Sequence, residues 1–94
     1  MIIGVLTFEL YLPGCHSLKE KRSFIKPVIV KLQRDFNLSV SEVDEQDKWQ
    51  KAVIACCMVG SDRDHVHSSL EHVVSFFERN WTEIIILNNS ITFI

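Results

Sequence analysis

The alternation of apolar and polar positions along the chain predicts six elements. Residues 2–12, IIGVLTFELYL, are rich in β-forming residues and end at a Pro-Gly pair, as strands do. Two later segments repeat apolar residues every three or four positions, which indicates helices. The predicted elements are strands at 2–12, 38–44, 49–60 and 82–88 and helices at 17–36 and 61–79. The last four residues, ITFI, either extend the final strand or pair separately.

Both predicted helices begin with residues suited to capping. Ser17 and Glu20 have the spacing of a capping box, and Ser61 and Asp64 repeat it. Asn37 tolerates left-handed backbone and is expected to end the first helix. The apolar stripes are Leu18, Ile25, Val28, Leu32 and Phe36 in the first helix and Val66, Leu70, Val73 and Phe77 in the second.

The order β-α-β-β-α-β predicts an α+β fold. Two split βαβ units with right-handed crossovers give a ferredoxin-like sandwich, a four-stranded antiparallel sheet with both helices on one face. The first and third strands then lie in the centre of the sheet. With 94 residues, the chain is expected to form a single domain over 1–94.

The other face of this sheet has no predicted cover, and its apolar positions suggest a partner. The outward positions of the third strand are Trp49, Lys51, Val53, Ala55, Cys57 and Val59. An apolar outer face favours a homodimer, although small scattered apolar residues also tolerate water. The interaction residues predicted on this face are Trp49, Val53 and Cys57.

Composition and cysteine content indicate the cellular location of the protein. The longest apolar run, AVIACCMVG, has about nine residues, and the ~20 needed to cross a membrane are not reached. The start of the chain lacks the basic leader of a secretory signal. Three cysteines do not suit a disulfide framework, so structural thiols are expected. We therefore predict a cytoplasmic protein with no membrane partner.

Charge is unevenly distributed along the chain. The net charge is −2, but residues 18–35 hold six basic and two acidic groups. Cations in the first turns of a helix oppose the helix dipole, whereas the N–H groups at that end attract anions. A phosphate-binding site would explain the cations, and a solvated face with local salt bridges is the alternative. The predicted phosphate-binding residues are Ser17, Lys19, Lys21, Arg22 and Lys26.

Residues suited to catalysis or metal binding are poorly arranged. His65, His67 and His72 lack the spacing of three or four that metal pairs need on a helix. Acidic residues around Asp44 and Asp47 could hold a hard cation, or serve an enzyme together with a histidine, but no nucleophile or cofactor motif accompanies them. We expect a polar hairpin tip there, and no catalytic residue, metal or cofactor.

Three segments together resemble a known family. LPGCHSLKEKR, FNLSVSEVD and QDKWQKAV, within residues 1–80, are similar to the YlxP-like family, a bacterial domain family of unknown function. The resemblance implies a ferredoxin-like fold. Genes of this family often lie beside those for ribosome-binding factor A and a translation initiation factor. The resemblance therefore also suggests ribosome maturation or RNA binding. It points to Asp47, Trp49 and Gln50, which occupy the QDxWQ element, as further interaction residues. It supplies no catalytic residues, and the segment after Asn80 diverges.

These observations lead to one functional hypothesis and one alternative. The first is a non-catalytic RNA- or ribosome-associated domain, with rRNA or a ribosomal subunit as its partner. Phosphates would contact the basic start of the first helix. The alternative is a homodimeric protein-interaction module that acts through the open sheet face.

Overall fold

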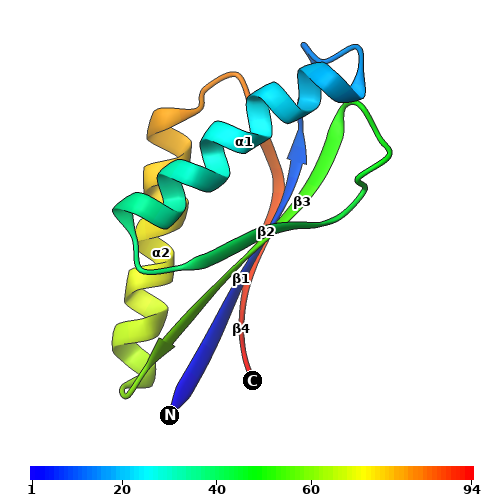
Figure 1. Ribbon diagram of the computed structural model, residues 1–94. Helices are drawn as coiled ribbons and strands as arrows, with labels where there is room; N and C mark the ends of the chain where they lie inside the picture. The colour runs from blue at the N-terminus through cyan, green and yellow to red at the C-terminus, as the bar shows by residue number, and fades with distance from the viewer.

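The computed structural model describes residues 1–94 as one sheet and two helices (Figure 1). Its elements are β1 (Ile2–Tyr11), α1 (Leu18–Asp35), β2 (Ser39–Asp44), β3 (Lys51–Gly60), α2 (Arg63–Asn80) and β4 (Ile85–Phe93). The strand order is β2-β3-β1-β4, and every neighbouring pair is antiparallel. The ferredoxin-like arrangement with β1 and β3 in the centre is therefore confirmed.

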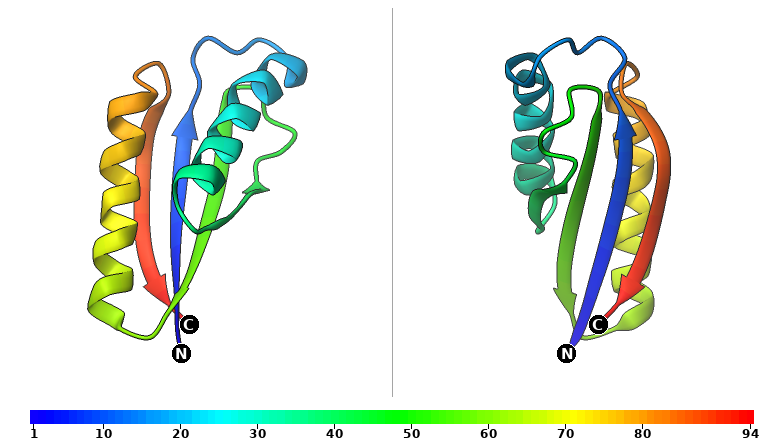
Figure 2. Two further views of the ribbon diagram at one scale, coloured as in Figure 1. Left: turned by 60° about the vertical axis from the view of Figure 1, so that its left-hand side comes forward. Right: turned by 90° about the vertical axis from the view of Figure 1, so that its right-hand side faces the viewer.

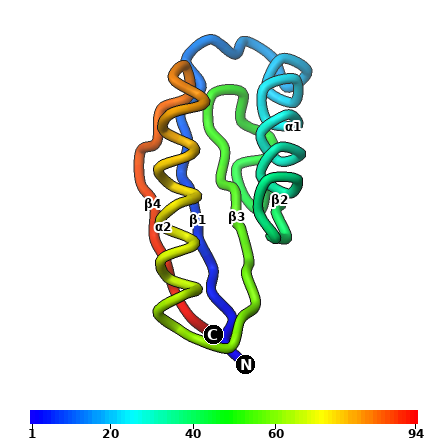
Figure 3. The backbone as a smooth tube through the Cα atoms, turned by 90° about the vertical axis from the view of Figure 1, so that its left-hand side faces the viewer, coloured from blue at the N-terminus to red at the C-terminus, as the bar shows by residue number.

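The two helices lie on the same side of the sheet. Figure 3 shows them in front of the strands, with α2 along β4 and β1 and with α1 beside β3 and β2. The opposite view, on the right of Figure 2, shows the sheet in front and both helices behind it. The two ends of the chain lie side by side, and the N–H of Ile94 donates to the carbonyl of Ile3 at 3.0 Å. One broad face of the sheet is left without a covering layer.

The core lies between the sheet and the helices. Leu6, Phe8 and Leu10 of β1 are almost fully buried, as the alternation of the strand predicts. The ring of Phe8 stacks on that of Phe77 with centroids 4.8 Å apart. The apolar stripes predicted for the helices face this core, except that Leu18 and Phe36 are only partly buried.

Two glycines let α2 approach the central strands closely. A Cβ at Gly4 would lie 2.6 Å from one methyl group of Val66, and a Cβ at Gly60 would lie 2.6 Å from the other. Any larger residue at these positions would push the first turn of α2 away from the sheet. Val66 is therefore enclosed by β1 and β3.

Two local predictions at the helix ends are wrong. The N-cap of α2 is Asp62, whose Oδ1 accepts from the N–H of Asp64 at 3.1 Å, so Ser61 does not cap the helix. A carboxylate at this position also suits the helix dipole. Asn37 does not adopt a left-handed conformation, because the chain leaves α1 through Phe36 in extended backbone.

The last strand begins later than the sequence predicts. The N–H of Ile84 bonds to the carbonyl of Trp81, so this segment forms a turn and β4 starts at Ile85. The final ITFI segment extends the same strand. The register between β1 and β4 shifts at Glu9–Leu10, where Leu87 is the extra residue of a bulge.

Candidate functional site

Lys21, a predicted phosphate ligand, lies inside the protein. Only 1% of the surface of this residue is exposed to solvent. Its Nζ lies 2.7 Å from Oε2 of Glu42 on β2 and donates to the carbonyl of Glu45 at 2.6 Å. The predicted role of Lys21 as a phosphate ligand at the surface is therefore wrong, because its ammonium group is enclosed and bonded within the chain.

The position of Lys21 follows from helical geometry. It stands four residues before Ile25 and seven before Val28, so it shares the buried face of α1. Glu42 pairs with Ile54 in the β2–β3 ladder, which directs both side chains to the helix side of the sheet. Oε2 of Glu42 is buried with no hydrogen bond of good angle, and the nearby Lys21 ammonium balances its charge.

The turn between β2 and β3 completes this contact. Glu45 has a positive φ of 60°, the only non-glycine residue with one, and its N–H bonds to Oδ1 of Asp44 at 2.8 Å. This left-handed turn brings its carbonyl to Lys21. The acidic segment at 42–47 is thus partly used to hold α1 in place.

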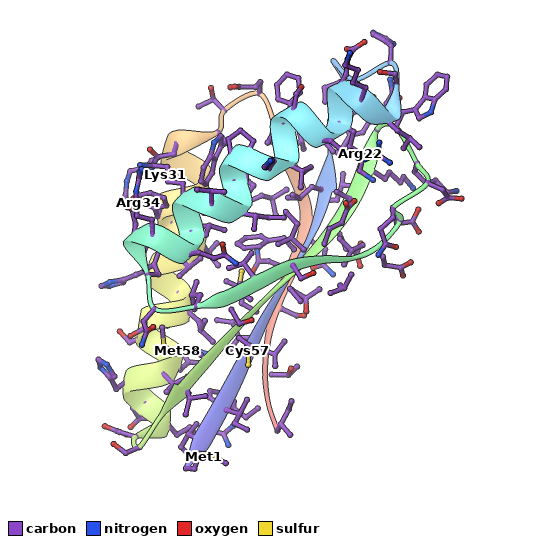
Figure 4. The ribbon with its side chains drawn as sticks, in the orientation of Figure 1. Met1, Arg22, Lys31, Arg34, Cys57 and Met58 are labelled. Carbon is purple, nitrogen blue, oxygen red and sulfur yellow. The ribbon has the colours of Figure 1, made fainter.

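The remaining predicted cations are exposed and free. Lys19, Arg22 and Lys26 are separated by three and four residues, so they share one face of α1. None of them forms an ion pair, whereas Lys31 and Arg34 both pair with Asp35. Figure 4 shows Arg22 near the start of α1 and the paired Lys31 and Arg34 near its end. The free cations therefore gather at the first half of the helix.

A hollow lies beside these cations. We define the α1–β2 groove by its lining residues, Arg22, Ile25, Lys26, Ile29, Val30 and Glu42. Its volume is about 370 Å³. Its floor is mainly aliphatic, and Val30 is 49% exposed. Ile29, Val30 and Glu42 were not predicted as site residues. The helical spacing of Ile29 and Val30, three and four residues after Lys26, nevertheless places them beside that lysine.

Ser17 caps α1 as predicted. Its side-chain oxygen accepts from the N–H of Glu20 at 3.1 Å, and its carbonyl accepts from the N–H of Lys21. The hydroxyl is therefore engaged by the helix itself. A phosphate at this end would meet the N–H groups of Leu18 and Lys19, which have no partner in the chain.

The QDxWQ segment divides into an internal and an exposed part. The side-chain amide of Gln50 donates to the carbonyls of Pro13 and Cys15 at 3.4 and 3.2 Å. Gln50 thus ties β3 to the loop that enters α1. Asp47 and Trp49 point outward, and Trp49 is 54% exposed.

The open sheet face is apolar along β3 and polar at its edges and at Thr7 and Glu9 of the central strand β1. Val53 and Cys57 on β3 are half-buried, and Val59 is 63% exposed. Their neighbours toward the edge strands are polar, for instance Ser39 opposite Cys57. Figure 4 shows Cys57 and Met58 on β3 within this sheet. The apolar part of this face is therefore a strip along β3 with polar residues on both sides.

The thiols of Cys15 and Cys56 are both buried. Burial raises the pKa of Cys56 to about 12. Burial, with a smaller contribution from Glu20, also raises the pKa of Cys15. Both groups stay protonated at neutral pH, which disfavours a nucleophilic role. Among the histidines, only His67 has an acidic partner, Glu71, with Nδ1 and Oε1 3.0 Å apart.

Neither helix is long and apolar enough to cross a membrane. A family model described as "Protein of unknown function (DUF503)" matches residues 3–90. "Uncharacterized protein YlxP" of Bacillus subtilis (strain 168) is 34% identical over 77 residues, which make up 82% of this chain and 84% of that protein. The resemblance to YlxP-like proteins is confirmed, and the chain belongs to the DUF503 family of proteins of unknown function.

Proposed function

We propose that this protein is a non-catalytic, cytoplasmic RNA-binding domain that associates with rRNA or a ribosomal subunit. The observation that carries the proposal is the line of three exposed, unpaired cations on α1, Lys19, Arg22 and Lys26. The link to ribosome maturation that the family resemblance implies agrees with it.

Three unpaired cations lie together on α1. Of the ten basic side chains, Lys21, Lys31, Arg34 and Lys48 have an acidic partner within the chain, whose net charge is −2. The six without one are Lys19, Arg22 and Lys26 on one face of α1, and Lys51, Arg63 and Arg79, which lie apart on β3 and at the two ends of α2. Unpaired cations on one face repel each other mildly, and an anionic ligand would relieve this repulsion. Phosphates of a nucleic acid are the ligand with matching repeated charge.

Binding of this kind would position RNA more than it would read sequence. Phosphate contacts give affinity and register, but they carry no direct information about bases. RRM-type recognition uses aromatic side chains on the central strands of an open sheet. Here the centre of the open face holds Val53, Ala55 and Cys57 on β3, which cannot stack on bases in that way.

Salt dependence tests this proposal directly. In K19A/R22A/K26A, the slope of log Kd against log salt for an rRNA fragment should fall by about 2–3, since each lost phosphate contact removes ~0.7–0.9. The matched control is K48A/K51A/R79A, which removes the same charge from other surfaces and should change the slope far less. Equal slopes for the two triple variants would contradict the proposal.

Association with ribosomes needs a separate measurement. In sucrose gradients of lysates from growing cells, the wild-type protein should sediment with a ribosomal subunit, and K19A/R22A/K26A should shift to the top fractions. Circular dichroism of the variant should remain native, because all three side chains are exposed. A wild-type protein that stays at the top at low salt would contradict ribosome association.

The open sheet face favours homodimerisation as a second function. The apolar strip along β3, Val53, Ala55, Cys57 and Val59, is the supporting observation. We expect the wild-type protein to scatter light as a dimer, and Val59→Lys to yield a monomer, since a charge would replace an exposed apolar side chain of this strip. Phe24→Ser, which removes an exposed apolar side chain from α1, is the control. A monomeric wild-type protein at high concentration would exclude this function.

A further inference from the structure

The α1–β2 groove specifies what kind of RNA this face would bind. We infer that the ligand is single-stranded RNA, with one unpaired base in the α1–β2 groove and its flanking phosphates on Arg22 and Lys26. This inference rests on the proposed RNA-binding function and deepens it.

The floor of the groove is apolar. Ile29 and Val30 present aliphatic surface directly beside two free cations, and Ile25 lies beneath them in the core. The outside of an RNA duplex offers phosphates, riboses and base edges, while the flat faces of its bases are stacked inside. Single strands expose those faces, which bind apolar or aromatic surfaces. A site with cations alone would suit either form, whereas cations beside an apolar hollow favour the single strand.

The size of the groove suits one nucleotide. The groove holds about 370 Å³, near the lower end of the ~300–1,000 Å³ range of small-molecule sites. Such a volume suits one nucleotide and not a stack of several. Arg22 and Lys26 are one helical turn apart on its lining, about 6 Å along the helix axis. They can therefore reach the phosphates on both sides of the bound nucleotide.

The negative charge of Glu42 in the groove is offset by Lys21. A free carboxylate in the groove would repel RNA phosphates, but the Nζ of Lys21 lies 2.7 Å from Oε2 of Glu42. The buried lysine thus offsets the negative charge where the groove meets β2. Carboxylate oxygens also accept hydrogen bonds from the amino groups of bases, so Glu42 is compatible with an unpaired base.

An acidic peptide with aliphatic side chains would have similar chemistry. The observations favour RNA because Lys19 extends the line of cations one turn beyond the groove, so the positive charge is longer than the hollow. A polymer with regularly spaced charge uses all three cations. Competition between the two ligands separates these possibilities.

Fluorescence anisotropy tests the inference with the full chain. The probes are a single strand of about 12 nucleotides, a site size typical of such proteins, and its duplex. We expect the single strand to bind at least about tenfold more tightly than the duplex, because the duplex cannot place a base in the groove. Val30→Ser should weaken single-strand binding about threefold to fivefold by removing apolar contact. It should leave duplex binding and the salt slope unchanged.

The controls make failures distinguishable. Phe24→Ser removes an exposed apolar side chain of α1 that does not line the groove, and it should bind like the wild type. Equal affinity for the two RNA forms, together with no effect of Val30→Ser, would overturn the inference and leave the proposed function standing. No binding to either form would overturn both. If a peptide of alternating glutamate and leucine displaced RNA at equal concentration, the occupant would be a protein segment, which also overturns the inference.

Discussion

The two helices share one burial pattern and differ in chemistry at one buried position. Each has 18 residues, and each buries four residues at the same steps along its length. The buried residues are Lys21, Ile25, Val28 and Leu32 in α1 and Val66, Leu70, Val73 and Phe77 in α2. Lys21 thus occupies the place in α1 that Val66 occupies in α2.

The difference shows two ways to attach the first turn of a helix to this sheet. Val66 fits against Gly4 and Gly60, so α2 is held by close apolar packing. Lys21 reaches Glu42 and the carbonyl of Glu45, so α1 is held by a buried ion pair and a hydrogen bond. A buried pair adds little net stability compared with apolar packing, but loss of one partner is costly. The polar attachment fixes the β2–β3 turn to the helix that carries the free cations.

The largest expected effect comes from Lys21→Ala. The variant leaves Glu42 without its counter-charge and opens a cavity, so unfolding free energy should fall by about 3 kcal/mol, at the low end for buried pairs because Glu42 is 20% exposed. Val66→Ala should lose about 2 kcal/mol from lost apolar contact alone. Urea denaturation followed by circular dichroism measures both. Lys19→Ala, which is exposed, should change stability by less than about 0.5 kcal/mol.

Equal stabilities of Lys21→Ala and Lys19→Ala would contradict the attachment of α1 by a buried ion pair. In that case the side chain of Lys21 would be free in solution, and it would again be available to a phosphate. A loss equal to that of Val66→Ala would instead mean that its alkyl chain matters and its charge does not.

A smaller effect is expected at Gln50, which ties β3 to the loop before α1. Gln50→Ala removes two side-chain hydrogen bonds, to Pro13 and Cys15, so about 1–2 kcal/mol of stability should be lost. The melting temperature should then fall by about 4–8 °C for each kcal/mol. Gln46→Ala, whose amide makes only a 3.5 Å bond to Glu42, is the control. A similar fall in both variants would show that the loss is not specific to this link.

The fold could be predicted from sequence because apolar spacing reports which face of each element is buried. The β-branched run of β1 and the apolar stripes of both helices each specify one face, and six such elements in this order allow few topologies. The start of β4 could not be predicted, because Thr82, Glu83 and Ile84 have the composition of a strand while the N–H of Ile84 bonds back to Trp81.

The candidate site was less predictable because charge was taken as a sign of exposure. Lys, Glu and Asp are rarely buried unless paired, and the partner of Lys21 is 21 positions away on another element. The periodicity of α1 nevertheless contains the signal, since position 21 continues the stripe of Ile25 and Val28 toward the N-terminus. Lys19, Arg22 and Lys26 lie off that stripe, and they are exposed as expected.

A double variant gives α1 an apolar side chain at the position where α2 has Val66. It should change the stability less than Lys21→Ala or Gln50→Ala does. In K21M/E42M, both charges are replaced by apolar side chains of similar length, so stability should lie within about 1 kcal/mol of the wild type. Because Lys19, Arg22 and Lys26 remain, the salt slope of RNA binding should not change. A slope lower by about 1 would show that Lys21 contacts a phosphate after all.

The smallest effect concerns the ends of the helices. At the end of α1, hydrogen bonds from Lys31, and then from Arg34, lower the pKa of Asp35, whereas no ion pair closes the end of α2. Because the folded-state pKa is the lower one, this contribution to stability is present at neutral pH and is lost as pH falls below about 4 through the folded value. The melting temperature of Asp35→Asn should therefore lie slightly below that of the wild type at pH 7 and match it near pH 2. Lys31→Gln in the Asp35→Asn background should add no further pH-dependent loss, because the pair is already broken. A gap between wild type and Asp35→Asn that stays constant down to pH 2 would mean that the ion pairs at this exposed helix end contribute nothing, as is common for surface pairs.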